Sequence, residues 1–134
     1  LDLPTEAQLW NQHAAPTLVA HGYDAPASRR FQLDAAGVER LVLERCEPLE
    51  LMERLAQRGC NQVLWECGPE LAAAALRQGC VQQLAAVLAP KLLGGQAART
   101  PLGDLELVDV NQAEPWHAQR LQQLGADWLW ELER

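Results

Sequence analysis

Residues 61–79 read NQVLWECGPELAAAALRQG, and this stretch carries the clearest secondary-structure signals of the chain. Its first six residues, up to Glu66, form a nearly continuous apolar run, which is typical of a strand covered on both faces of a sheet. Gly68 can cap a following helix, Pro69 suits its first position, and Gly79 ends it. The helix is expected to place four apolar side chains on one side: Leu71, Ala72, Ala75 and Leu76. The stretch therefore predicts a strand, a tight turn and a helix, which together are a unit of an α/β fold.

The sequence on either side continues this alternation of strands and helices. Three further strands are predicted, at residues 17–21, 40–44 and 81–89. A helix is predicted to begin at Pro48 and to end at Gly59, because proline fits a helix start and glycine a helix end. The segment that follows the first strand, through Arg30, contains Pro, Ser and Arg and is predicted as a loop.

The C-terminal part of the chain carries weaker local signals. Residues 91–103 are rich in Gly and Pro and are predicted as an ordered loop that crosses the surface. Residues 105–110 alternate like a strand. From residue 116 to the end, composition favours a helix, whereas the turn at Gly125 and the pattern of residues 127–133 favour a β-hairpin. Local propensity leaves these two possibilities open.

Composition narrows the class of protein. The 134 residues suit one domain, so residues 1–134 are predicted to be a single domain. Eighteen acidic against eleven basic residues give a net charge of −7, which argues against nucleic acid and membrane surfaces as partners. The chain has no apolar run near the roughly 20 residues that a bilayer requires, and its start does not resemble a signal peptide. It also begins without Met, which suggests a fragment.

The cysteines and histidines do not form a metal motif. Cys46, Cys60, Cys67 and Cys80 include no CxxC pair, and the three histidines fit no zinc spacing with them. Buried, reduced thiols are favoured over disulfides, because a chain of this length and apolar content does not need disulfides to fold. These features predict a cytoplasmic protein without a metal site.

The tryptophans are interpreted mainly as packing residues. Trp65 adjoins Glu66 and must point to the opposite face of its strand, toward a helix. Trp128 and Trp130 share one face of the last strand, where at least one of them is expected to contact the core.

The turn after Glu66 is the strongest candidate for a binding site. A strand followed by Gly68, Pro69 and a helix brings unpaired backbone N–H groups together, and the helix dipole favours an anion such as phosphate there. Gly68 leaves the backbone accessible, and the small side chains of residues 72–74 leave room for a bulky ligand. The alternative is purely structural: Gly-Pro starts the helix well, and the alanines pack it against the sheet. The turn lacks the complete GxGxxG fingerprint, so both interpretations stay open at this point.

Residues 63–76, followed by Gly79, Leu84 and the stretch 89–95, which reads APKLLGG, resemble the C-terminal reductase domain of the RibD family of bifunctional riboflavin biosynthesis proteins. The resemblance is dense over residues 61–103. It implies a dihydrofolate reductase-like α/β fold with a mixed, mainly parallel sheet flanked by helices and a C-terminal β-hairpin. It also implies that the chain is the C-terminal portion of the family domain and that the N-terminal part is missing.

The same resemblance implies NADPH-dependent reduction of 5-amino-6-(5-phosphoribosylamino)uracil to its ribitylamino product. Glu66 would bind the substrate. Lys91 matches a family lysine, but it is equally well interpreted as a solvent-facing charge in a loop. The cofactor would contact Gly68, Pro69, Glu70, Leu71, Ala72, Ala73 and Ala74. No catalytic residue can be assigned, because the segments that hold the substrate phosphate and the nicotinamide belong to the missing part. The family's acidic pair before Leu84 is replaced here by Gln82 and Gln83, so some polar contacts are expected to be lost.

The resemblance also implies partners and leaves alternatives. A homodimer through the apolar strand 84–88 and a fused deaminase domain in the parent chain are expected. One alternative is a non-catalytic nucleotide-binding or dimerisation module of the same fold. A hydrolase or transferase that uses His21 or His117 is disfavoured, because Ser28 is the only serine and no nucleophile elbow surrounds it.

Overall fold

The computed structural model describes residue 4 and residues 6–95 and 100–134. The chain divides into two compact units, Leu1–Asn61 and Gln62–Arg134, and each unit is described by itself. The single domain predicted from the length of the chain stays a prediction.

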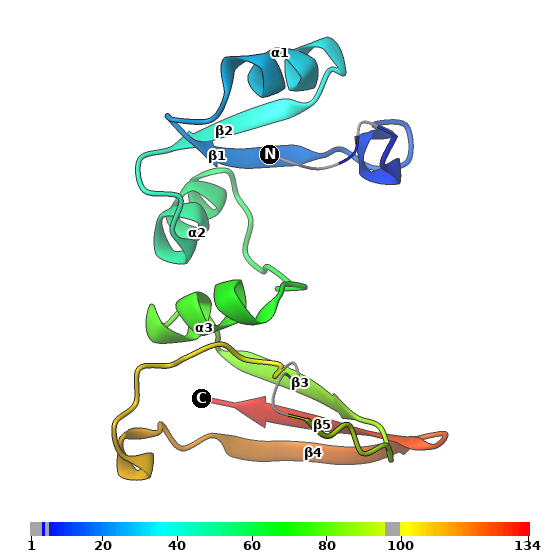
Figure 1. Ribbon diagram of the computed structural model, residues 1–134, viewed down its shortest axis with the longest axis vertical. Coiled ribbons are helices and arrows are strands. Elements are labelled where there is room, and N and C mark those ends of the chain that lie inside the picture. The colour runs from blue at the N-terminus through cyan, green and yellow to red at the C-terminus, as the bar shows by residue number, and fades with distance from the viewer. Residues whose placement is uncertain (1–3, 5, 96–99) are drawn as a thin grey trace. The chain divides into compact units, whose positions relative to one another are not determined.

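The first unit is a parallel βαβ arrangement followed by a helix (Figure 1). Its elements are the 3-10 helix η1 (Gln8–Trp10), strand β1 (Leu18–Gly22), helix α1 (Ala27–Ala35), strand β2 (Glu39–Leu43) and helix α2 (Pro48–Gln57). β1 and β2 are in register from Leu18 opposite Glu39 to Gly22 opposite Leu43. The two strands and the helix beginning at Pro48 were predicted from the sequence, and the structure confirms them.

Helix α1 corrects the predicted loop through Arg30. Pro26 occupies the N-cap position in an extended conformation, and the helix starts at the next residue. Arg29 donates a hydrogen bond to Gln32 one turn ahead, and Leu33 is buried. Residues with Pro, Ser and Arg resemble a loop when composition alone is considered. Here, however, the proline precedes a run of good helix formers, so it marks a helix start.

Local features fix both ends of α2: a glycine after its last turn and a carboxylate in its first turn. Gly59 has φ of +86° directly after α2, in the left-handed region where glycine is favoured, so the predicted stop is confirmed. At the other end, the Glu50 carboxylate accepts hydrogen bonds from the N–H groups of Glu44 and Arg45 at 2.7 and 2.8 Å. These two bonds, with the Glu44 N–H first, hold the pKa of Glu50 below its ordinary value of 4.5.

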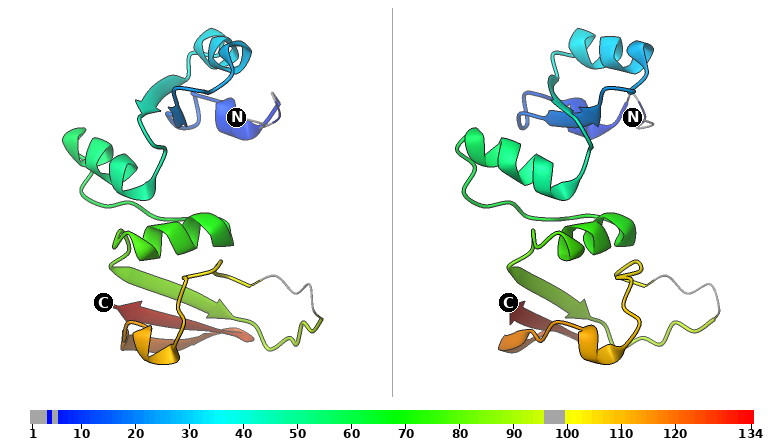
Figure 2. Two further views of the ribbon diagram at one scale, coloured as in Figure 1. Left: turned by 60° about the vertical axis from the view of Figure 1, so that its left-hand side comes forward. Right: turned by 90° about the vertical axis from the view of Figure 1, so that its left-hand side faces the viewer.

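The second unit joins one helix to an antiparallel sheet. Its elements are helix α3 (Pro69–Arg77), strand β3 (Gln83–Leu88), the 3-10 helix η2 (Val110–Gln112), strand β4 (His117–Leu124) and strand β5 (Asp127–Glu133). Figure 2 shows the sheet from two further sides, with strand order β3-β5-β4. β4 and β5 form the hairpin that the family resemblance implied, with Gly125 at φ of +63° in the turn. The α/β class is confirmed. The described strands are not mainly parallel as expected, however, because one strand pair is parallel and two are antiparallel.

Two predicted strands are absent from the part of the chain that the structure describes. Residues 61–66 have no regular secondary structure. Burial alternates from Val63 to Cys67 as in a strand, but no described strand pairs with them. Leu64 is 80% exposed, so the expectation of a strand covered on both faces of a sheet is wrong. An apolar pattern does not by itself supply the neighbouring strand with which a ladder forms. The strand predicted at residues 105–110 does not form. Glu106 has φ of +60°, which interrupts an extended backbone, and Asp109 already caps η2.

Burial in the second unit differs from the sequence-based expectation. The residues buried there are small: Ala73, Ala75 and Cys80. Leu71 is 43% exposed, so the predicted apolar side of α3 is wrong at that residue. Trp128 and Trp130 are 42% and 39% exposed, so neither of them is part of the core as was expected.

The four cysteines are all free. The prediction of reduced thiols agrees with this, but the prediction that they are buried holds only for Cys80. Cys67 is half-buried, and Cys46 and Cys60 are exposed. Burial raises the pKa of the Cys80 thiol, because the buried site disfavours the charged thiolate.

Candidate functional site

The turn before α3 is open to solvent at Gly68. This residue is the N-cap of α3, with φ of −74° and ψ of 171°, and it supplies no capping side chain. A Cβ atom added at Gly68 would meet no heavy atom within 4 Å. Pro69 follows at the first helical position, as predicted. A bulky group can therefore approach the backbone of this turn from outside.

The first turn of α3 offers free hydrogen-bond donors. Ala72 donates its N–H to the Gly68 carbonyl at 3.0 Å and closes the first helical bond. Among the described residues, the N–H groups of Glu70 and Leu71 find no acceptor, as is usual for the first positions of a helix. Together with the helix dipole, these donors favour a negatively charged oxygen. The exposed Glu70 side chain opposes this preference, so any contribution of that residue comes from its backbone.

The alanines of α3 are not equally accessible. Ala72 and Ala74 are half-buried, whereas Ala73 is only 1% exposed. A Cβ atom placed on Gly103 would lie 3.5 Å from the Ala73 side chain. Ala73 is therefore covered by another part of the chain. Unlike the other residues of the predicted segment 68–74, it is not available to a ligand.

The segment that covers Ala73 comprises residues 100–106, and we call it the strap. In Figure 1 it runs alongside α3 in yellow. Gly103 donates its N–H to the Pro69 carbonyl at 2.9 Å, at the start of the helix. Arg77, at the other end, donates to the Asp104 carbonyl and lies 3.6 Å from a Glu106 carboxylate oxygen. No local sequence pattern indicates this contact, because the strap is distant from α3 in the sequence and Gly103 was predicted only as a loop residue.

Glu66 and Lys91, the two charged residues that the family resemblance selected, are both exposed. Glu66 directly precedes the turn. No hydrogen bond or ion pair joins it to Lys91 in the described ranges, so the structure gives no paired site for them. Part of the predicted loop 91–103, residues 96–99, lies outside the described residues.

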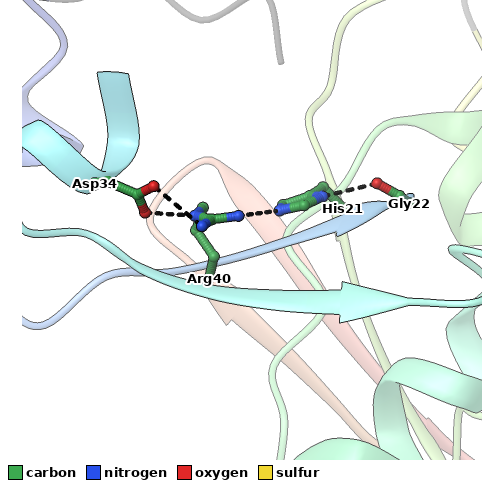
Figure 3. Close-up of polar contacts among 4 residues, drawn as sticks. All are labelled: His21, Gly22, Asp34 and Arg40. Carbon is green, nitrogen blue, oxygen red and sulfur yellow. Dashed lines mark hydrogen bonds and ion pairs between the residues drawn. The ribbon is translucent and has the colours of Figure 1, made fainter. Parts of the chain in front are cut away.

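The first unit contains a separate polar network, drawn in Figure 3. The Arg40 guanidinium donates to both carboxylate oxygens of Asp34, at 2.6 and 3.1 Å, and lies 3.3 Å from Nε2 of His21. Nδ1 of His21 lies 2.8 Å from the Gly22 carbonyl, and the residue is only 4% exposed. Because a carbonyl and a guanidinium flank the ring, the neutral tautomer with the proton on Nδ1 satisfies both contacts.

This network argues against the hydrolase interpretation. Both ring nitrogens of His21 already make polar contacts, so the ring cannot act as a general base without breaking one of these contacts. Arg40 and Asp34 also line a shallow hollow of about 210 Å³ together with Ala27, Arg30 and Phe31. Asp34 neutralises Arg40 there, whereas Arg30 has no ion-pair partner among the described residues and its Nε is buried without a hydrogen-bond partner.

No group of three or more His, Cys, Asp or Glu residues is arranged to hold a metal ion in the described ranges. None of the described helices is long and apolar enough to cross a membrane.

Comparison with known proteins identifies relatives in one family. Residues 1–130 match the family model described as RibD C-terminal domain. The riboflavin biosynthesis protein RibD of Synechocystis sp. is 49% identical over 129 residues, which cover 96% of this chain and 35% of that protein. The chloroplastic riboflavin biosynthesis protein PYRR of Arabidopsis thaliana is 37% identical and is covered to 22%. The chain thus spans about a third or less of these relatives.

Solved structures support the same fold. RibD of Acinetobacter baumannii superposes with a TM-score of 0.78 at 25% identity, over 98% of this chain and 34% of that one. A pyrimidine reductase-like protein from Corynebacterium diphtheriae superposes with a TM-score of 0.76 over 98% of this chain and 56% of that one. Its 18% identity supports the fold alone.

Proposed function

The chain belongs to the RibD C-terminal domain family, and on this premise we propose that it is part of a reductase domain of riboflavin biosynthesis. Its substrate would be 5-amino-6-(5-phosphoribosylamino)uracil and its cofactor NADPH. The observation that carries the proposal is the open turn at Gly68, which lies within the stretch of densest family resemblance and presents unbonded N–H groups.

Gly68, Glu70 and Leu71 would hold the cofactor through their backbone. The N–H groups of Glu70 and Leu71 would donate to the pyrophosphate oxygens, and the missing side chain of Gly68 would let the phosphates approach. Pro69 fixes the start of α3 and so fixes the direction of these donors. The half-buried Ala72 and Ala74 would border the ligand without obstructing it.

Glu66 would recognise the pyrimidine. Its carboxylate is exposed directly before the turn and accepts hydrogen bonds only, which suits the N–H groups of an aminopyrimidine. NADPH, when bound, supplies the hydride that reduces the anomeric carbon of the ribose and opens it to a ribityl chain. The protein's part in this is to hold the substrate beside the turn in a fixed orientation.

The test is NADPH binding and turnover by the full-length protein, with Gly68→Val as the decisive variant. The branched side chain would occupy the approach to the phosphates, so the Kd for NADPH is expected to rise about tenfold or more. Gly68→Ala is the matched control for backbone conformation. Glu70→Gln should leave binding equal or tighter, because it removes a negative charge near the anion. Unchanged NADPH affinity in Gly68→Val would contradict this placement of the cofactor.

Turnover separates the reductase from the alternative module. A non-catalytic nucleotide-binding domain would bind NADPH saturably, yet it would not oxidise it in the presence of the aminopyrimidine substrate. Glu66→Gln should raise KM for the substrate while leaving the Kd for NADPH unchanged, since the carboxylate is assigned to the pyrimidine.

We further propose that the protein forms a homodimer through β3. This strand lies at an edge of the described sheet and exposes 63% of Val87 and 52% of Leu88. An exposed apolar edge is a ready site for pairing with a second copy. Sedimentation of wild type and Val87→Lys tests this, and a dimer that persists in the variant would refute it. A fused deaminase domain in the parent chain is proposed from the family resemblance, and a cytoplasmic location from the four free thiols.

A further inference from the structure

The strap is attached to α3 at both ends, and this arrangement bears on the proposed cofactor site. We propose that Arg77 is a positioning residue: it holds the strap in place so that Gly103 forms a fixed wall beside the first turn of α3. This wall would set the space available to the cofactor's pyrophosphate. The inference rests on the proposed function, because it assigns the neighbouring turn to a pyrophosphate.

At the start of α3 the strap lies closer to the helix than a Cβ atom ordinarily allows. A Cβ atom on Gly103 would lie 3.1 Å from the Pro69 carbonyl oxygen and 3.4 Å from its carbonyl carbon. The Gly103 N–H bonds to the same oxygen. The strap therefore lies directly against the residue that follows Gly68, while the space around Gly68 itself is open. Gly103 therefore covers one side of the first turn of α3, and the side at Gly68 is open.

At the other end, Arg77 fixes the strap by two different contacts. Its guanidinium donates to the Asp104 carbonyl and pairs with the Glu106 carboxylate. The Asp104 carboxylate accepts the Glu106 N–H at 2.7 Å, and Glu106 has φ of +60°, which a residue with a side chain seldom adopts. Without Arg77 the strap would keep two neighbouring carboxylates and a strained residue but would lose the cation that pairs with Glu106 and bonds to the Asp104 carbonyl. We therefore expect its loss to release the strap.

Binding of ligands with and without a pyrophosphate tests this role in the full-length protein. Arg77→Ala is expected to raise the Kd for NADPH about tenfold, equivalent to about 1.4 kcal/mol. The Kd for adenosine 2′-monophosphate, which has no pyrophosphate, should not change. Turnover at saturating NADPH should stay within about twofold, because only cofactor binding is affected. Gly103→Ala should act in the same direction as Arg77→Ala, because its methyl group forces the strap away from Pro69.

Two further variants make the result decisive. Arg77→Lys keeps the positive charge but cannot reproduce the planar guanidinium contacts, so it should restore only part of the NADPH affinity. Arg58→Ala removes a comparable exposed ion pair, with Glu39, and should leave NADPH binding unchanged. Equal loss of affinity for both ligands in Arg77→Ala would indicate general damage to the fold and would overturn the inference.

The outcome is separable from that of the proposed function. If Gly68→Val weakens NADPH binding while Arg77→Ala and Gly103→Ala do not, the strap has no positioning role and the cofactor site still stands. If Gly68→Val also has no effect, the cofactor does not bind at this turn, and both proposals fail.

Discussion

The two units of this chain bury different kinds of side chain. The first unit buries branched apolar residues, Leu33, Val38 and Leu43, and next to them a histidine whose polar atoms are satisfied. The buried residues of the second unit are two alanines and a cysteine, while large residues such as Trp128 are partly exposed. Small buried side chains let a backbone segment lie directly on a helix, as the strap does on α3.

This difference separates polar groups that serve stability from those that are free to bind. In the first unit the polar atoms of His21, Asp34 and Arg40 pair with one another. In the second, the N–H groups at the start of α3 have no partner among the described residues. Satisfied groups inside a fold contribute to its stability, whereas unsatisfied donors at an accessible turn are available to a ligand.

The largest expected loss of stability follows from the core of the first unit. Leu43 is 2% exposed, so Leu43→Ala should lower the free energy of unfolding by about 2–4 kcal/mol. Urea denaturation followed by circular dichroism measures this. Leu121→Ala in the second unit is the matched control. It removes the same atoms from a residue that is 61% exposed and should cost less than about 0.5 kcal/mol. Equal losses would mean that the two units do not differ in burial.

A smaller loss is expected when the polar network of the first unit is broken. Arg40→Ala removes a two-point contact with Asp34 and the partner of a buried histidine. Because Arg40 and Asp34 are 26% and 52% exposed, the expected cost is discounted to about 1–2 kcal/mol. Arg58→Ala removes a single surface pair and should cost about 0–1 kcal/mol. If Arg40→Ala and Arg58→Ala lower the free energy of unfolding in urea equally, the network stabilises the fold no more than a surface ion pair does.

Glycine substitutions compare a helix end in each unit. At Gly59 an added Cβ meets no atom within 4 Å, yet φ is +86°, so Gly59→Ala should cost about 1–2 kcal/mol from backbone strain alone. At Gly68 the space is equally open and φ is −74°, so no backbone strain arises, but alanine is a poorer N-cap than glycine and Gly68→Ala should cost about 0.5–1 kcal/mol. Thermal unfolding midpoints decide this. A large loss at Gly68 would mean that this glycine is required by the fold, which weakens its assignment to a ligand.

The smallest effect is a pH dependence confined to the first unit. The folded-state pKa of Glu50 is lowered by backbone N–H groups, so its contribution to stability is present above the unfolded value of 4.5 and is lost as the pH falls below it. The urea midpoint should therefore fall more between about pH 7 and pH 3.5 in wild type than in Glu50→Gln. Glu53→Gln, on the same helix, is the control. Equal falls in all three proteins would show that Glu50 does not hold the loop before α2.

Local signals predicted the helices that have clear boundaries. Pro48 and Gly59 bound α2, and Pro69 and Gly79 bound α3, because proline and glycine have backbone preferences that act without tertiary context. Sequence missed α1, since its first residues resemble a loop in composition. The hairpin of β4 and β5 required the family resemblance, because helix and strand propensities were balanced there.

Contacts between distant residues could not be predicted. Residues 61–66 carry a strand pattern, yet strand assignment depends on a paired neighbour that the pattern does not specify. For the candidate site, the predicted residues, Glu66 and Gly68 to Ala74, lie close together in the sequence, so one motif proposed them together. Arg77 and Gly103 lie outside that motif in the sequence. Their contact depends on how the chain returns to α3 after β3, which no local spacing encodes.

The hairpin also has a consequence for the order in which the second unit assembles. β4 and β5 are joined by the short turn at Gly125 and Ala126, so they can pair within microseconds once the chain is free to fold. β3 pairs with the same strand, β5, but the chain from Leu88 to Trp128 must first close a long loop. We expect the hairpin to form early and to present the edge of β5 as a template on which β3 docks late. During that interval the apolar edge of β5 is unpaired, so aggregation during refolding should start there.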